Sequence, residues 1–137
     1  MSIMRWLYLV LLVCMPGLAQ AAEEDWLSVA ELVNQKLDSA LTHYQAGDEQ
    51  TARRDIIQAY FGPFEGEKME AAIRSQLGIE PAFMLERQFS SLRKAIKAGK
   101  PVATVQKGVE ELNQALNEHA LLLNEAGVPR SVFQVNQ

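Results

Sequence analysis

The strongest constraint on the fold of this chain is the spacing of its apolar residues, which recur every three or four positions. The longest such pattern follows Pro101 and occupies seven positions: Val102, Val105, Val109, Leu112, Leu116, His119 and Leu123. This spacing places the side chains on one face of an α-helix. No stretch alternates with a period of two, and no hairpin turn signal stands out, so strands are not predicted.

The same spacing recurs in the earlier part of the chain, and Gly or Pro residues separate the periodic stretches. Gly47, Gly78 and Gly99 are typical helix ends, and Asp48 is a plausible N-cap. Gly62-Pro63 interrupts the second stretch, because proline lacks the backbone donor that a helix interior needs. The predicted helices cover residues 25–46, 48–61 with a further piece over 64–77, 80–99 and 101–127.

Each apolar stripe must be buried against another, and the connections between the predicted helices are short. Short connections make sequential helices antiparallel neighbours. We therefore expect an all-α fold, an antiparallel up-down four-helix bundle whose second helix is kinked at Gly62-Pro63. The bundle domain is expected to cover 22–129, and 130–137 is expected to be a flexible tail.

The first 21 residues have the features of a cleavable signal peptide. Arg5 precedes an apolar run from Trp6 to Val13, and Ala19-Gln20-Ala21 has the small-x-small pattern of a cleavage site. The run is shorter than the ~20 residues of a membrane-spanning helix. Cys14 raises a lipoprotein alternative, but Val13 is not the small residue that a lipobox needs. We expect export and a periplasmic location, with no stable membrane span after cleavage.

The expected mature chain, 22–137, is acidic. It has 12 Lys and Arg against 17 Asp and Glu, a formal net charge of −5. An acidic chain argues against nucleic acid as the main partner. Cys14 is the only cysteine and would be removed with the signal peptide, so neither disulfides nor thiolate metal sites are expected.

Two features break the hydrophobic pattern. His119 occupies a core-facing step of its predicted helix, where it is either an ordinary buried histidine or a metal or haem ligand. Glu65 shares an inward face with Met69 and Ile73, where a lone carboxylate is costly unless paired or metal-bound. The acidic residues from Glu65 to Glu70 have an alternative explanation, because acids are enriched at helix N-termini.

Several cofactor and enzyme classes lack their sequence signatures. No Glu-x-x-His pair supports a di-iron centre, and no Cys-x-x-Cys-His supports covalent haem. A b-type haem held by His119 with Met69 or Met84 stays open, although methionines at helical spacing are more often core. No nucleophile–base constellation or phosphate-binding loop occurs, so an enzyme is not expected.

The segment Ala59-Tyr60-Phe61-Gly62-Pro63-Phe64-Glu65-Gly66-Glu67-Lys68-Met69-Glu70 resembles the extracytoplasmic region of bacterial iron permeases. Its pattern is Ala-Tyr-Phe, then Phe-Glu, then Met-Glu, followed on the next helix by Glu-x-x-Phe, here Glu86 to Phe89. The chain lacks the membrane helices of that family and their Arg-Glu-Gly-x-x-Glu signature. The resemblance implies a helical periplasmic domain that helps to present iron to a permease.

Carried over to this chain, the resemblance implies that Glu65, Glu70 and Glu86 contact a cation. His119 is not part of the family pattern, and it is a candidate ligand only because of its position in the helical periodicity. Carboxylates alone suit hard ions, and oxygen with nitrogen ligands suits Fe, Mn, Zn or Cu. We expect a non-catalytic domain that binds iron or another divalent metal ion, with a membrane iron permease or a related envelope protein as partner. The alternatives are a metal-independent interaction module of the envelope and the b-type haem protein.

Overall fold

The computed structural model describes residues 25–133. The predicted signal peptide and the last four residues of the predicted tail lie outside the described residues. Within this range the chain is all-helical and has no strand, as the spacing predicts. The elements are α2 (Trp26–Gln45), α3 (Glu49–Ala59), the π-helix η1 (Tyr60–Phe64), α4 (Met69–Gln76), α5 (Ile79–Lys97), α6 (Val102–Glu125) and the 3₁₀-helix η2 (Arg130–Phe133).

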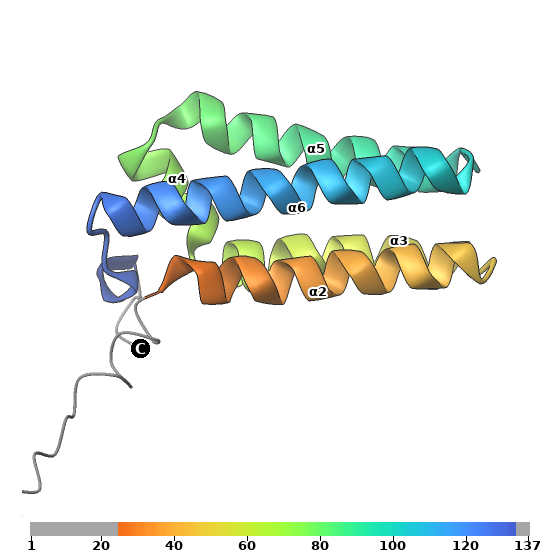
Figure 1. Cartoon of the computed structure of the whole chain (residues 1–137), viewed down its shortest axis with the longest axis horizontal. Coiled ribbons are helices and arrows are strands. Elements are labelled where there is room, and N and C mark those ends of the chain that lie inside the picture. Colours follow the sequence, from red (N-terminus) through yellow and green to blue (C-terminus); the bar gives the residue numbers. More distant parts are fainter. Residues whose placement is uncertain (1–24, 134–137) are drawn as a thin grey trace, which may run out of the picture.

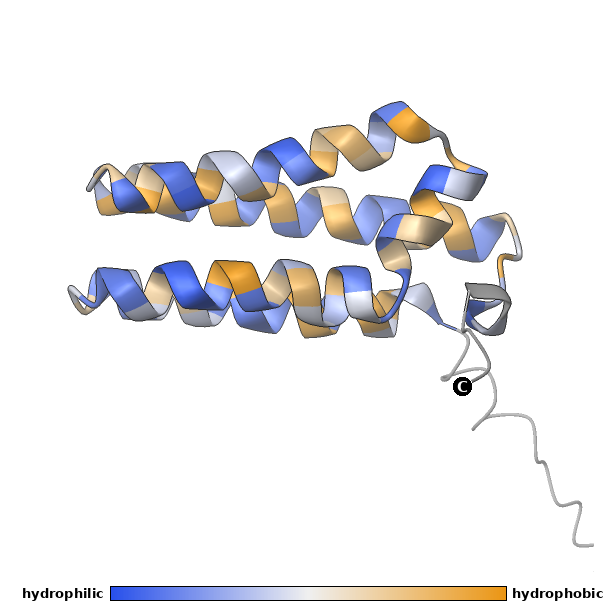
Figure 2. Cartoon of the chain, turned by 180° about the vertical axis from the view of Figure 1, so that it is seen from behind, coloured by the Kyte–Doolittle hydropathy of each residue, from blue (hydrophilic) through white to orange (hydrophobic). Residues whose placement is uncertain are grey.

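The four long helices bury their apolar stripes against one another. Helix α2 packs on α3 and α6, and α5 packs on α6 and α3. In Figure 1, α2 and α3 form one layer and α5 and α6 form the other, with α4 between the layers at one end. Figure 2 shows hydrophobic residues recurring along each helix between hydrophilic ones. The buried side chains form one core, which includes Trp26, Phe64, Leu85 and Leu116.

Polar contacts join the start of α2 to the end of α6. The Trp26 ring nitrogen donates to the carbonyl of Val128 at 2.7 Å, and the Trp26 backbone nitrogen donates to the Asn124 side chain at 3.0 Å. Asn124 in turn donates to Asp25 at 2.6 Å, and Asp25 caps α2 by accepting from the Leu27 nitrogen. These contacts fix the end of the molecule at which η1 and α4 also lie (Figure 1).

The segment from Tyr60 to Met69 differs from its predicted geometry. The π-helix spans Gly62-Pro63, and its wider turn shifts the side chains relative to an α-helix. Phe64 is fully buried and Glu65 is exposed. The prediction that Glu65 faces the core was therefore wrong. The reason is that the π-turn, followed by a left-handed residue at Lys68 (φ 68°), breaks the register assumed between Glu65 and Met69.

The part of the predicted tail within the described residues begins as a 3₁₀-helix. Arg130 donates to Glu67 at 2.6 Å, so η2 contacts the turn before α4. Among the described helices, none combines the length and apolar composition needed to cross a bilayer.

Candidate functional site

The candidate site is built around Tyr60, the first residue of the π-helix. Single-turn π-helices occur often at functional sites. The Tyr60 ring lies edge-on to Phe89 of α5, with centroids 5.3 Å apart, and 5.6 Å from Phe64. Phe64 and Phe89 are themselves 5.1 Å apart. This aromatic cluster holds the Tyr60 ring between η1 and α5, so the position of its hydroxyl is set by packing.

The Tyr60 hydroxyl donates to Glu70 Oε2 at 3.3 Å. The other oxygen of Glu70 accepts from Arg74 Nη2 at 2.5 Å. The same guanidinium nitrogen donates to Glu86 Oε1 at 2.8 Å, so Arg74 joins α4 to α5. Because one nitrogen contacts both of them, the carboxylates of Glu70 and Glu86 lie close together. We call Tyr60, Glu70, Arg74 and Glu86 the acidic cluster.

Within the acidic cluster, the surroundings of Glu70 and of Tyr60 favour the protonated forms of these two groups. Burial raises the pKa of Glu70, and hydrogen bonding to Glu86 and its negative charge raise it further, against the lowering effects of Arg74 and Tyr60. The pKa of Tyr60 is raised to about 12, first by burial and then by the charges of Glu70, Glu86 and Glu65. All three predicted glutamates therefore act electrostatically on one phenol, although Glu65 itself is exposed.

The acidic cluster is open to solvent on one side. The side chain of Glu70 is 14% exposed and that of Glu86 is 30% exposed, whereas Arg74 is 50% exposed. A groove of about 180 Å³ adjoins the cluster between α3 and α5. Its lining residues are Ile56, Ile57, Tyr60, Phe61, Glu86, Phe89, Ser90 and Arg93. An ion or a small group can thus reach the carboxylates from the surface.

The donor atoms suit a hard cation, because carboxylates and a phenol supply only oxygen. In residues 25–133, however, no three His, Cys, Asp or Glu side chains are arranged to hold a metal ion. Two of the predicted ligands, Glu70 and Glu86, both accept hydrogen bonds from the guanidinium of Arg74. In the conformation described, the cation bound by the two carboxylates is therefore the guanidinium of Arg74.

His119 lies apart from these glutamates. It is half-buried on α6, and its Nδ1 donates to the carbonyl of Ala115 in the same helix at 2.7 Å. No contact joins it to Glu65, Glu70 or Glu86 among the described residues. For the haem alternative, Met69 is fully buried in the core and Met84 is half-exposed on α5. A ligand role for His119 stays a prediction that no contact supports.

Two members of the acidic cluster were missed by sequence reasoning. Arg74 lies four residues after Glu70, a spacing at which opposite charges pair on a helix surface. Tyr60 lies in the Ala-Tyr-Phe motif on which the family resemblance depends. Both signals were present in the sequence, but neither indicates that the two side chains meet at the same carboxylate.

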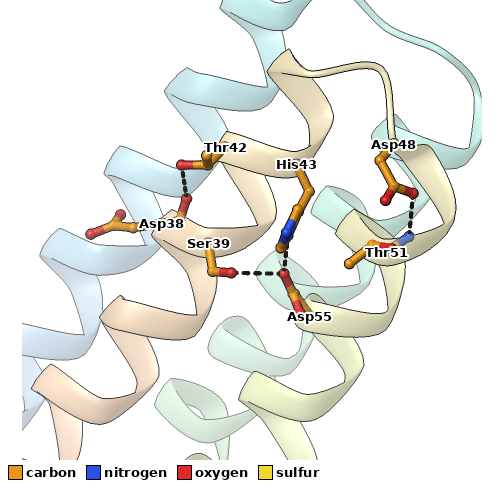
Figure 3. Close-up of polar contacts among 7 residues, drawn as sticks. All are labelled: Asp38, Ser39, Thr42, His43, Asp48, Thr51 and Asp55. Carbon is orange, nitrogen blue, oxygen red and sulfur yellow. Dashed lines mark hydrogen bonds and ion pairs between the residues drawn. The ribbon is translucent and has the colours of Figure 1, made fainter.

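A second polar cluster joins α2 to α3 near the opposite end of these helices (Figure 3). Asp55 is buried, and its Oδ2 accepts from Ser39 Oγ at 2.9 Å and lies 2.7 Å from His43 Nδ1. The carboxylate lies between the other two residues. In a catalytic triad the histidine occupies that middle position and takes the proton of the serine. This order gives no activated nucleophile, so the cluster stabilises the contact between helices.

Comparisons with known proteins add no identification. No family model matches the chain, and neither a characterised protein nor a solved structure matches it significantly. The relation to the extracytoplasmic region of iron permeases stays a prediction that depends on the motif from Ala59 to Glu70 and on the later Glu86 to Phe89.

Proposed function

We propose that this chain is a periplasmic, antiparallel four-helix bundle that binds iron or another divalent metal ion and presents it to a membrane iron permease. The metal ion is cargo, and the chain catalyses no reaction. Glu70 and Glu86 are the principal ligands, Tyr60 supplies a third oxygen, and Glu65 joins from the exposed side. His119 is left outside the ligand set, because within residues 25–133 its polar contact is with its own helix.

The observation that carries this proposal is the pairing of two acidic residues from different helices. Glu70 and Glu86 accept hydrogen bonds from the same guanidinium nitrogen, that of Arg74, so their carboxylates lie close together. Two like-charged carboxylates that lie so near each other favour uptake of a proton or a cation, because either one relieves their repulsion. The pair is therefore a cation-binding element, and Arg74 is the cation that it holds in the conformation described.

The partial exposure of the acidic cluster suits delivery better than storage. A presenting domain must release its ion, and a site with few ligands at the surface exchanges ions more readily than an enclosed one. The adjoining groove lies between α3 and α5, with Glu86 and Arg93 on its α5 side and an apolar wall that includes Phe61. A partner that docks there would reach the carboxylates without unfolding the domain.

Calorimetric titration of the purified protein with Mn²⁺, and with Fe²⁺ under anaerobic conditions, tests the proposal. We expect binding of one ion that is abolished when Glu70→Gln and Glu86→Gln are combined. The matched control combines Glu80→Gln and Glu110→Gln, which remove the same charge from exposed positions. Equal binding by the two double variants, or no binding by the unaltered chain at millimolar ion, would reject the metal-binding function.

A second candidate function is supported by the exposed apolar residues around the groove. Phe61 is 61% exposed and Ile57 is 38% exposed, and both line the groove. Such residues are typical of an interaction surface. A metal-independent interaction module predicts that Phe61→Ser abolishes binding to a membrane-extract partner and that Glu70→Gln with Glu86→Gln does not. The reverse result, with a requirement for metal ion, favours presentation of iron.

A further inference from the structure

We propose that the groove between α3 and α5 is the contact surface of a homodimer, in which a second copy of this chain covers it about a two-fold axis. Phe61 and Ile57 line this groove with exposed apolar side chains, and Ile56 and Phe89, which also line it, are buried. Exposed apolar residues gathered at one place mark an interaction surface. The inference concerns what covers the groove, and it does not depend on metal binding by the acidic cluster.

The two ends of the groove carry opposite charges. Glu86 and Arg93 both line it from α5 and are seven residues apart, which is two helical turns or about 10 Å along the axis. In Figure 1 the end of α3 and the start of α5 lie together near α4, and the start of α3 and the end of α5 lie at the far side. Phe61 and Glu86 are therefore at the α4 end of the groove, and Ile57 and Arg93 are at the other end.

The positive end of the groove lacks a carboxylate partner inside the molecule. Within residues 25–133 Arg93 takes part in no ion pair, and neither does Arg53, which lies one turn before Ile57 on the same face of α3. The buried Nε of Arg53 has no hydrogen-bond acceptor in the same range. Glu86 accepts from Arg74, but its side chain is 30% exposed, so a second cation can approach it from the groove. Both ends can therefore pair with charges of another molecule.

Two-fold symmetry pairs these opposite ends. In a two-fold dimer each groove meets the other in reverse, and every contact between two different residues occurs twice. Glu86 of each copy then faces Arg93 of the other, and the exposed Phe61 faces the apolar end at Ile57. A charge pattern that is complementary to its own reverse favours a second copy over a partner of uniform charge. Because such a dimer covers the groove, another protein can dock there only on the monomer.

Sedimentation velocity of the purified protein, at concentrations from about 1 µM to about 1 mM, tests the inference. We expect the unaltered chain to form dimers in this range. Arg93→Glu places like charges opposite each other twice, and Glu86→Arg does the same, so each variant alone should dimerise at least about tenfold more weakly. The matched control is Arg87→Glu, which makes the same charge change on the side of α5 that faces α6. Its dimer affinity should stay within about threefold of that of the unaltered chain.

An equal mixture of Arg93→Glu and Glu86→Arg gives the most specific result. Opposite charges face each other across the two-fold axis only when one copy of each variant combines, so the mixture should recover dimers that neither variant forms alone. The inference is overturned if the unaltered chain is monomeric at about 1 mM, if the mixture stays monomeric, or if Arg93→Glu dimerises as well as Arg87→Glu. Any of these results would leave the groove to a partner of different sequence.

Circular dichroism checks that each variant folds. If Glu86→Arg does not fold, Phe61→Ser replaces it and should weaken the dimer as Arg93→Glu does, because it removes the exposed apolar contact. Unchanged dimerisation of Phe61→Ser would overturn the inference. Failure of the dimer leaves the calorimetric test of metal binding unaffected, so the two proposals can fail separately.

Discussion

Glu70 on α4 and Glu86 on α5 are sixteen positions apart in the sequence, yet their carboxylates accept hydrogen bonds from the same guanidinium nitrogen. The π-helix and the turn that follows it bring α4 against α5, and Arg74 joins the two carboxylates. The same segment buries Phe64 and exposes Glu65. The consequences of this arrangement can be measured.

The register of the π-helix predicts unequal losses of stability when two nearby phenylalanines are replaced. Phe64 is 0% exposed and Phe61 is 61% exposed. Phe64→Ala should lower the free energy of unfolding by about 3–5 kcal/mol, because it leaves a cavity in the core. Phe61→Ala should change it by about 0.5 kcal/mol or less. Urea unfolding of both variants measures the difference, and equal losses would contradict the register.

Glu70 should make stability depend on pH. Because its pKa is raised on folding, the folded chain keeps a proton that the unfolded chain loses above the ordinary value of 4.5. The contribution of Glu70 to the free energy of unfolding is therefore fully present below pH 4.5 and falls as the pH rises through the folded pKa. In Glu70→Gln this fall should disappear.

Urea unfolding at pH values from about 4 to 8 checks the pH dependence of Glu70. Glu80→Gln controls for the loss of one exposed charge on α5. If the free energy of unfolding of Glu70→Gln changes with pH in the same way as that of the unaltered chain, Glu70 is not the group that causes the pH dependence.

Tyr60 should ionise late in an alkaline titration. Its pKa is raised from 10 to about 12, so its contribution to stability is present below pH 10 and is lost as the pH rises towards 12. In an alkaline titration followed by phenolate absorbance, a step should appear above pH 10 in the unaltered chain and should be missing in Tyr60→Phe. Glu70→Gln should shift this step to lower pH, since it removes a neighbouring negative charge. A late step that persists in Tyr60→Phe would assign it to another tyrosine.

The buried carboxylate between α2 and α3 should contribute to stability. Asp55→Ala leaves Ser39 Oγ and His43 Nδ1 without their partner and should cost about 1–3 kcal/mol. Thr42→Val is a suitable control, because the Thr42 hydroxyl donates to its own helix, at the carbonyl of Asp38, as Figure 3 shows. In thermal and urea unfolding, Asp55→Ala should be clearly less stable than Thr42→Val. Equal stability of the two variants would refute the structural role of this cluster.

Much of the helical structure could be predicted from local signals. Apolar periodicity located the long helices, and Asp48 caps α3 as predicted by accepting from the Thr51 nitrogen at 3.0 Å. The register after Tyr60 could not be predicted in this way. A π-turn has no local sequence rule comparable to a cap, and here it accompanies the burial of Phe64 against Phe89, a contact between residues 25 positions apart.

The candidate site was predicted in part. Glu70 and Glu86 were singled out by the family resemblance, and in the structure both accept from the Arg74 guanidinium. Glu65 was assigned to the wrong face because an unbroken α-helical register was assumed. His119 follows the apolar stripe of α6, but that spacing cannot show that its Nδ1 bonds to Ala115 of its own helix. Arg74 was missed because its double pairing depends on the packing of α4 against α5.

The most direct test of the central claim is a crystal of the protein soaked with Mn²⁺ and examined by anomalous scattering. The account predicts one peak within coordination distance of Glu70 and Glu86, with the Arg74 guanidinium moved away from both. A map with no peak there, and with Arg74 still bound to both carboxylates at millimolar Mn²⁺, would contradict it.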